Sequence, residues 1–267
     1  MNWRPIAGVV LRQFYLLRGS PVRLFPMVSW VAIDIVLWGF ITRYLNSVSG
    51  NGMNFVPTLL GAVLLWDFCT RIMQGVTTAF LEDVWSRNFL NLFASPLSIA
   101  EYVSGLVTTS LLTSILGLAV MLLVATSAFG LHFFALGLSL AVFLVVLFLF
   151  GITLGIVGTA IVLRFGPASE WLLWPLPAVL APFAAVFYPL ATLPAWMQAV
   201  AHALPPAYVF EGLRALLAGR AFPADRLALG AGIAVVELLL AGALYVRVYR
   251  RAVRTGLLAR YSAEGAS

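Results

Sequence analysis

Residues 102–163 decide the fold: they read YVSGLVTTSLLTSILGLAVMLLVATSAFGLHFFALGLSLAVFLVVLFLFGITLGIVGTAIVL and carry no charged side chain. At about 1.5 Å per residue, these 62 residues reach roughly 90 Å as helix, enough to cross a hydrocarbon core of about 30 Å twice. Only helices and closed barrels satisfy the backbone in lipid, and a barrel shows short alternating strands instead of continuous apolar runs. The stretch therefore predicts a helical hairpin in a membrane.

The composition of the whole chain agrees with a membrane protein. Hydrophobic residues make up 62% and charged residues 10% of the 267 positions, whereas soluble domains average about 45–50% and about 25%. The 16 basic residues are all arginine, and the net charge is +6. In a membrane protein such an excess indicates arginines held on one side of the bilayer, so no nucleic-acid partner is expected. One cysteine, Cys69, excludes a disulfide within the chain and a multi-thiolate metal site.

Working outward from the hairpin, we expect an all-α integral membrane protein that forms a single domain over 1–267. Six transmembrane helices are expected at 24–45, 55–79, 102–127, 134–163, 171–190 and 227–249. With the N-terminus inside, the inner segments hold 11 arginines and the outer segments hold 4, while Arg71 lies within a span. This bias predicts that both termini are cytoplasmic.

Residues 2–18 predict an amphipathic helix before the first span. At about 100° per residue, five of its apolar side chains fall within an arc of roughly 80° on one side of the helix. They are Trp3, Ile6, Val10, Phe14 and Leu17. Such a helix either lies in the headgroup layer or packs, as a cytosolic extension, against a partner.

The segment 171–210 combines high hydrophobicity with frequent proline. Its 40 uncharged residues hold seven of the 14 prolines of the chain. Proline removes a backbone donor and breaks helices, so the span over 171–190 is expected to be kinked. Residues 194–219 predict two short outer helices that start at Pro194 and Pro206 and dip partway into the membrane. The alternative, a simple extracellular loop, would be less apolar.

Several kinds of catalytic site are excluded by the residues present. A phosphate-binding loop of the G-x-x-x-x-G-K-[ST] type needs a lysine, and the chain has none. His132 and His202 fall in different outer loops without carboxylates or cysteines at ligand spacing, so no metal site is expected. The chain is therefore not expected to be an enzyme or to bind a cofactor itself.

Charges inside the spans are costly and are candidates for function. Asp67 and Arg71 are one helical turn apart, in the order that favours an i,i+4 ion pair. The pair either neutralises itself in a structural role or lines a substrate path. Asp34 and Glu237 have no partner nearby in the sequence and are structural or line the same path.

Residues 86–95 predict a short helix between the second and third spans. Ser86 is placed to cap it, Pro96 stops it, and Phe89, Leu92 and Phe93 make it more apolar than a solvated loop. On the arginine-rich side of the membrane, such a helix either docks in a groove of a soluble partner or lies flat on the membrane face.

Two stretches of sequence resemble the permease subunits of ABC transporters of the type-two export group. In the first, Glu82 ends the second span and the run Asn91-Leu92-Phe93-Ala94-Ser95-Pro96 matches the Leu-x-x-Ser-Pro that closes the next short helix in that family. The second runs from Pro189 to Arg214 and resembles the pattern P-x-x-x-L-P-x-W … L-P-x-x-Y-x-x-E-x-x-R. One departure is Arg87-Asn88, where many members carry Gly-Thr.

The resemblance implies a permease that works as a dimer, with each subunit bound to an ABC ATPase. Helix 86–95 would be the coupling helix, and the implied ATPase-coupling residues are Glu82, Asp83, Arg87, Phe89, Leu92, Phe93, Ser95 and Pro96. The substrate would pass between the first and fifth spans, and the candidate path residues are Asp34, Trp38, Asp67, Arg71, Trp174 and Phe187. The residues of the outer motif are Pro189, Leu193, Pro194, Trp196, Tyr208, Glu211 and Arg214.

The function implied is export of an amphipathic, lipid-linked, glycan or drug-like substrate across a bacterial inner membrane. ATP and Mg would bind the partner ATPase, and a homodimer is favoured over a heterodimer. Two alternatives stay open: a membrane assembly or scaffold protein without transport, and a polytopic membrane enzyme such as a lipid-modifying transferase. The sequence does not identify the substrate.

Overall fold

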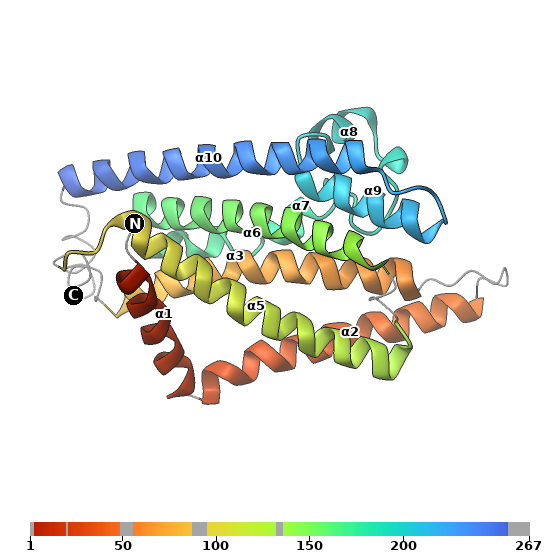
Figure 1. Ribbon diagram of the computed structural model, residues 1–267, viewed down its shortest axis with the longest axis horizontal. Coiled ribbons are helices and arrows are strands. Elements are labelled where there is room, and N and C mark those ends of the chain that lie inside the picture. The colour runs from red at the N-terminus through yellow and green to blue at the C-terminus, as the bar shows by residue number, and fades with distance from the viewer. Residues whose placement is uncertain (1–2, 20, 49–55, 87–94, 132–135, 256–267) are drawn as a thin grey trace.

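The computed structural model describes residues 3–19, 21–48, 56–86, 95–131 and 136–255, and this part of the chain is helical throughout its regular elements. Five long helices lie along the molecule (Figure 1): α2 (Pro21–Val48), α3 (Gly61–Trp85), α5 (Ile99–Phe129), α6 (Leu138–Phe165) and α10 (Ala224–Arg254). The shorter helices are α1 (Trp3–Arg18), α7 (Leu176–Leu180), α8 (Ala195–Ala201) and α9 (Pro205–Leu217). The predicted all-α fold is confirmed for the described residues.

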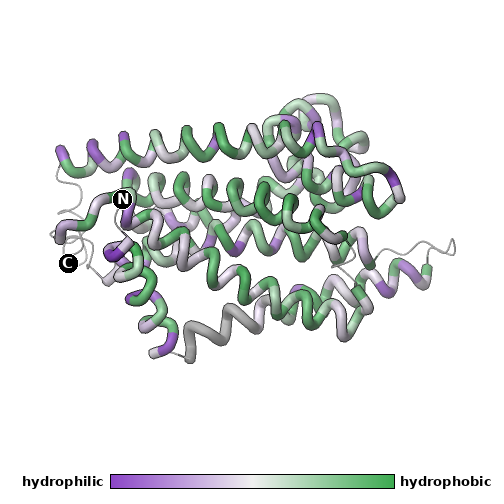
Figure 2. Tube along the Cα trace, in the orientation of Figure 1, coloured by the Kyte–Doolittle hydropathy of each residue, from purple (hydrophilic) through white to green (hydrophobic). Residues whose placement is uncertain are grey.

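The molecule has two distinct ends. One carries α1 and the last turns of α3, α6 and α10, and we call it the terminal end; the other carries α8 and α9, and we call it the distal end (Figure 1). Hydrophobic residues dominate the middle of the long helices, and hydrophilic residues gather toward both ends (Figure 2). This distribution is the one that a bilayer imposes on a bundle that crosses it.

Four helices in the described part are long and apolar enough to cross a membrane. They are Val56–Trp85, Ile99–Phe129, Leu138–Phe165 and Ala224–Arg254. The first includes a turn of π-helix, Val56–Leu60, that runs directly into α3. These helices contain the predicted spans 102–127 and 227–249 entirely, and all but the first residues of the predicted spans 55–79 and 134–163. The chain is therefore a multi-pass membrane protein.

The expected fifth span, 171–190, is not one continuous helix. Pro167–Leu172 is a 3₁₀ segment, α7 covers only five residues, and Leu190–Thr192 is again 3₁₀. Four prolines between 175 and 189 each remove a backbone donor, so regular i,i+4 bonding stops after short stretches. The segment nevertheless leads from the terminal end, where α6 stops, to α8 and α9 at the distal end (Figure 1).

The centre of the bundle is α3, which packs against α5 on one side and α6 on another, while α10 covers α6. Two glycines let α6 approach α3 closely. A Cβ atom on Gly151 would lie 2.8 Å from the carbonyl oxygen of Cys69, and one on Gly155 would lie 2.8 Å from Cβ of Val76. In lipid, helices are held together mainly by such close packing of small residues, because burial of apolar surface contributes little between them.

Helix α1 packs on α5 through a different face than the sequence predicted. Its buried residues are Ile6, Val9 and Gln13, and Val9 fills the space beside Gly105. Of the predicted apolar face only Ile6 is buried, whereas Trp3 is 68% and Phe14 55% exposed. Angular position along the helix predicted the apolar face, but the contact is set by Gly105, whose lack of a side chain leaves room for Val9. Trp3 and Phe14 are thus exposed on the surface of the described part of the chain.

Helix α5 begins where the connector from α3 ends. Ser98 Oγ accepts from the backbone N–H of Glu101 at 3.3 Å, and Glu101 Oε2 accepts from the N–H of Ser98 at 3.1 Å. This capping box satisfies two backbone donors at the start of α5. At the other end of the connector, Ser86 is the residue that ends α3, with a helical backbone conformation. Both ends of the connector are thus held by regular helix termini.

Candidate functional site

Three groups of polar residues stand out against the apolar bundle. The first is the Asp83 cluster, formed by Arg12 of α1, Asp83 of α3 and Tyr102 of α5 at the terminal end. Arg12 Nη2 donates to Asp83 Oδ1, and the Tyr102 hydroxyl donates to Asp83 Oδ2 at 2.7 Å. Asp83 is 2% and Tyr102 0% exposed. One carboxylate therefore ties three helices together through charge-assisted hydrogen bonds.

The end of the connector lies beside the Asp83 cluster. A cavity of about 230 Å³ separates α1 from Ser95, Pro96 and Leu97, and Arg12 is among its lining residues. Ser95 and Pro96 are exposed there, and Glu82 is half-buried next to Asp83 in α3. Four predicted coupling residues (Glu82, Asp83, Ser95 and Pro96) thus lie at the terminal end. The other four (Arg87, Phe89, Leu92 and Phe93) lie outside the described residues.

The second group lies inside the bundle, and we call it the Asp67 group. Arg71 Nε donates to Asp67 Oδ2 at 2.5 Å, which confirms the spacing-based ion pair, and both side chains are less than one fifth exposed. Asp34 of α2 interacts electrostatically with both charges. Two carboxylates and one guanidinium therefore lie together in this group.

An aromatic pair extends the Asp67 group toward the broken segment. Trp38, one turn after Asp34 in α2, stacks on Phe187 with ring centroids 5.0 Å apart and 12° between the planes. Five of the six candidate path residues therefore come from α2, α3 and the segment after α7 that carries Phe187. The sixth, Trp174, is 46% exposed, and no ring contact among the described residues joins it to the others. Glu237 in α10 is also separate: its Oε2 is buried without a hydrogen-bond partner in the described part of the chain.

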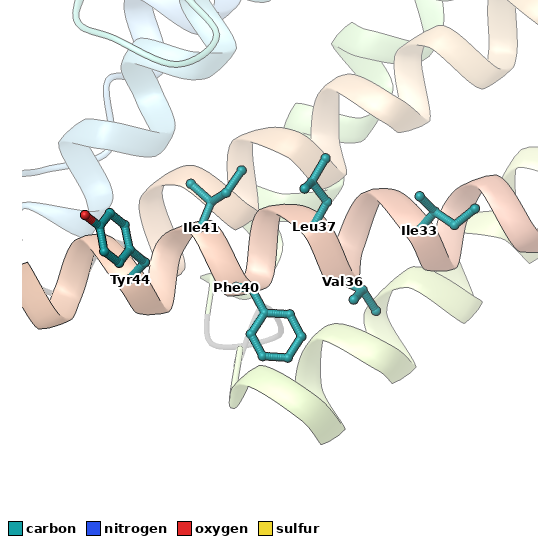
Figure 3. A pocket seen from close by; sticks show the side chains of 6 residues that line it. All are labelled: Ile33, Val36, Leu37, Phe40, Ile41 and Tyr44. Atoms are coloured by element: carbon teal, nitrogen blue, oxygen red, sulfur yellow. The ribbon is translucent and has the colours of Figure 1, made fainter.

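Next to this group, α2 presents an apolar face that the described residues leave largely exposed. Ile33, Leu37, Ile41 and Tyr44 succeed one another along the helix, with Val36 and Phe40 beside them (Figure 3). Together they line a shallow groove of about 560 Å³. Tyr44 is 66% and Phe40 59% exposed, values that for large side chains indicate contact with lipid or with another protein.

The third group is the outer motif at the distal end. There Glu211 and Arg214 of α9 form hydrogen bonds with the backbone of the broken segment 171–190. Glu211 Oε1 accepts from the backbone N–H of Leu190 at 2.8 Å and from Arg214 Nη2 at 3.0 Å. Arg214 also donates to the carbonyl oxygens of Ala185 at 2.7 Å and Val186 at 3.3 Å. Burial lowers the pKa of Arg214, and the Glu211 carboxylate opposes that shift. The Glu-x-x-R element therefore satisfies backbone groups that the prolines leave without helical partners.

The other residues of the outer motif shape the turns before α9. Pro194 caps α8, Pro189 precedes the 3₁₀ turn, and buried Leu193 accepts a hydrogen bond from Gln198 through its carbonyl oxygen. Trp196 meets Phe183 edge to face, and the Tyr208 hydroxyl donates to the carbonyl oxygen of His202 at 2.8 Å. All seven motif residues lie between residues 189 and 214 in the described part of the chain.

Two residues of these groups were not expected from sequence. Arg12 was one of several arginines in the amphipathic helix, and Tyr102 was the first residue of a predicted span. No short-range pattern links either to Asp83, because they lie 71 and 19 residues away. Within the described ranges, no group of three or more His, Cys, Asp or Glu side chains is arranged to hold a metal ion.

Comparison with known families decides the identity. Residues 10–218 match the family described as ABC-2 type transporter. The chain belongs to the ABC-2 type transporter family. No curated protein matches it. The matched range begins in α1 and ends just after α9, so it includes the Asp83 cluster, the Asp67 group and the outer motif.

Membership in the ABC-2 family fixes the class of protein. The chain is the permease domain of an ABC transporter, a non-catalytic transmembrane subunit, and it implies an ABC ATPase as partner. The earlier resemblance to type-two export permeases is thereby confirmed. The missing lysine is consistent with this division, because the phosphate-binding loop belongs to the ATPase.

The Asp67 group of this ABC-2 permease leads to a testable prediction about its free energy of unfolding. Arg71→Gln is expected to lower the free energy of unfolding by about 3 kcal/mol, because Asp34 and Asp67 then repel each other without the guanidinium with which both interact. Adding Asp67→Asn is expected to restore part of the loss, since one repelling charge disappears. Thermal unfolding of the purified variants in detergent measures both effects. A double variant no more stable than Arg71→Gln would contradict the charge account.

Proposed function

We propose that this ABC-2 permease is the membrane subunit of an ATP-driven exporter that moves an amphipathic, lipid-linked, glycan or drug-like substrate outward. The observation that carries the proposal is the Asp83 cluster. It joins the interfacial helix α1, the core helix α3 and α5 directly beside Ser95 and Pro96. A movement of the connector would therefore be transmitted to three helices at once. Such transmission is needed if an ATPase that closes beneath the membrane is to drive the permease.

The membrane topology that we propose has six spans and two cytoplasmic termini. Four spans are the helices already identified. Helix α2, with 28 residues, has a length of about 42 Å and is long enough to be the first. The broken segment between α6 and α8 is the fifth crossing, since α6 ends at the terminal end and α8 lies at the distal end (Figure 1). The arginine bias supports a cytoplasmic terminal end, and α8 and α9 would then be outer half-helices.

Two copies of the chain would enclose the substrate path. The uncovered face of α2 is suited to lie near a second copy, and Asp34 and Trp38 are at its edge, next to Arg71 and Phe187. A homodimer brings two such edges together around one axis. In this arrangement the Asp67 group and the aromatic pair line the path, and Trp174 remains a candidate path residue.

The contact with the ATPase is proposed for the connector 86–95, with Phe93 as its apolar anchor. Phe93→Asp is expected to reduce the amount of ATPase that co-purifies with the permease by at least about tenfold, because a carboxylate cannot be buried in an apolar groove. The measurement uses the permease and its ATPase expressed together, purified through a tag on the permease. Phe165→Asp is the matched control, since Phe165 is an exposed aromatic residue that ends α6 at the same end of the bundle.

The outcomes separate coupling from folding. The Phe93 variant should keep its thermal unfolding midpoint and lose both bound ATPase and transport. The Phe165 variant should keep all three. Normal retention of the ATPase by the Phe93 variant would refute the proposed docking site, and a complex that binds ATPase without transporting anything would favour an assembly role instead.

A further inference from the structure

A second cavity lies at the distal end, between α9 and the start of α10, and nothing derived above uses it. Its volume is about 490 Å³. Its charged and polar lining residues are His202, Tyr208, Glu211, Arg220 and Arg226. Small residues such as Gly212, Ala215 and Ala221 provide the open space between them.

The shape of this distal cavity follows from the turn that joins the two helices. Gly219 has φ of 69°, a conformation that ends α9 and favours glycine, and Pro223 caps α10. A Cβ atom on Gly230 would lie 2.9 Å from Cβ of Tyr208, so α10 meets α9 closely there. The turn therefore places Arg220 and the first residues of α10 around a common opening.

The charges that line the distal cavity do not balance. Glu211 is already engaged by Arg214 and by the backbone N–H of Leu190. Arg220 and Arg226 are exposed, and neither forms a salt bridge within the described ranges. The carboxylate nearest in sequence, Asp225, is not among the lining residues. Two guanidinium groups therefore face the cavity without an anionic partner.

One side of the distal cavity continues into the lipid-facing surface of α10. Leu229 lines the cavity and is 57% exposed. Further exposed apolar residues follow it along the same side of the helix at spacings of seven and four residues: Val236, Leu240 and Leu244. In a membrane-spanning helix such a stripe contacts acyl chains. An anion whose tail runs along α10 would thus place its charged head between the two arginines.

We propose that the distal cavity binds the phosphate group of an anionic phospholipid, with Arg220 and Arg226 as its charge partners and the acyl chains along Leu229, Val236 and Leu240. Guanidinium groups suit this role because they donate paired hydrogen bonds to phosphate oxygens. His202 contributes a ring N–H, and the half-buried ring of Tyr208 forms part of the wall. The inference requires only that the chain spans a membrane, so it stands apart from the proposed export function.

The test places a reporter in the cavity. A cysteine at Ala221, which is exposed and lines the cavity, is labelled with an environment-sensitive fluorophore; the single native thiol, Cys69, is buried. The labelled full chain in neutral detergent is titrated with phosphatidylglycerol, with phosphatidylcholine of the same acyl chains, and with inorganic phosphate. A saturable response is expected at about tenfold lower phosphatidylglycerol than phosphatidylcholine. Inorganic phosphate is expected to give no response, because it lacks the chains.

Variants distinguish specific binding at Arg220 and Arg226 from non-specific electrostatic attraction of the lipid to exposed arginines. Arg220→Gln with Arg226→Gln should remove the preference for phosphatidylglycerol, and the pair of lysine replacements should keep most of it. The double change Arg247→Gln with Arg250→Gln removes two exposed arginines from the other end of α10 and should leave the response unchanged. Equal responses to both lipids, or a normal response of the Arg220 and Arg226 glutamine variant, would overturn the proposal. If inorganic phosphate alone bound saturably, the proposal that the bound phosphate group belongs to a lipid would be overturned.

Discussion

Asp83→Ala is expected to lower the free energy of unfolding by about 3–5 kcal/mol, because it leaves the partly buried Arg12 and the fully buried Tyr102 without the carboxylate that both bind. Nε and Nη1 of Arg12 already have no hydrogen-bond partner within the described residues, so no other hydrogen bond there would hold the guanidinium in the variant. The loss is expected to be largest locally, since α1 is joined to α3 at this point. Tryptic cleavage after Arg18, at the end of α1, should therefore become at least about tenfold faster.

Two further variants show whether the Asp83 charge is the cause. Tyr102→Phe removes one hydroxyl and should cost about 1 kcal/mol, with little change in cleavage. Arg12→Ala added to Asp83→Ala should recover stability relative to Asp83→Ala alone, because no unpaired guanidinium remains. Thermal unfolding in detergent and the time course of cleavage check these expectations. If trypsin cleaves the Asp83→Ala variant at the wild-type rate, the Asp83 cluster does not hold α1 in place.

Arg214→Ala is expected to have the second large effect, a loss of about 3 kcal/mol and a fall in the unfolding midpoint of roughly 6–12 °C. Its guanidinium satisfies two backbone carbonyl oxygens and the Glu211 carboxylate. One of these carbonyls belongs to Ala185, which has φ of 51°, in the left-handed region that side chains other than glycine rarely adopt. Without Arg214, the strained turn loses the contacts that hold it.

The design of this experiment uses two replacements of the same residue. Arg214→Lys keeps the charge but cannot reach two carbonyl oxygens and a carboxylate at once, so an intermediate midpoint is expected. Glu211→Gln keeps the acceptor for the N–H of Leu190 and should also be milder than Arg214→Ala. Differential scanning fluorimetry of the purified proteins gives the three midpoints. Equal midpoints for alanine and lysine at 214 would show that geometry is unimportant there.

The features predicted well from sequence are those set by spacing along one helix. The apolar stretch 102–163 forms α5 and α6, and Asp67 and Arg71 form their ion pair because four residues make one turn. The short helices α8 and α9 begin at Ala195 and Pro205, within one residue of the positions that the prolines indicated. In each case the deciding interaction is local.

The features that sequence did not reveal depend on contacts between distant segments. The Asp83 cluster requires α1 to cross α5 at Gly105, and that crossing is set by how closely Val9 can approach. The break in the segment 171–190 was expected as a kink, but four prolines and the left-handed Ala185 divide it completely. Its stability comes from Glu211 and Arg214, which lie 21 to 29 residues farther along the chain.

The central claim is that this permease draws its energy from a separate ABC ATPase, and ATP hydrolysis in proteoliposomes tests it most directly. The rate is measured for the permease alone, for the permease purified together with its ATPase, and for the same complex with Asp83→Ala. The account predicts no hydrolysis by the permease alone, hydrolysis by the complex, and loss of its substrate stimulation when the Asp83 cluster is broken. Hydrolysis by the isolated permease, or a permease that retains no ABC ATPase, would contradict the account.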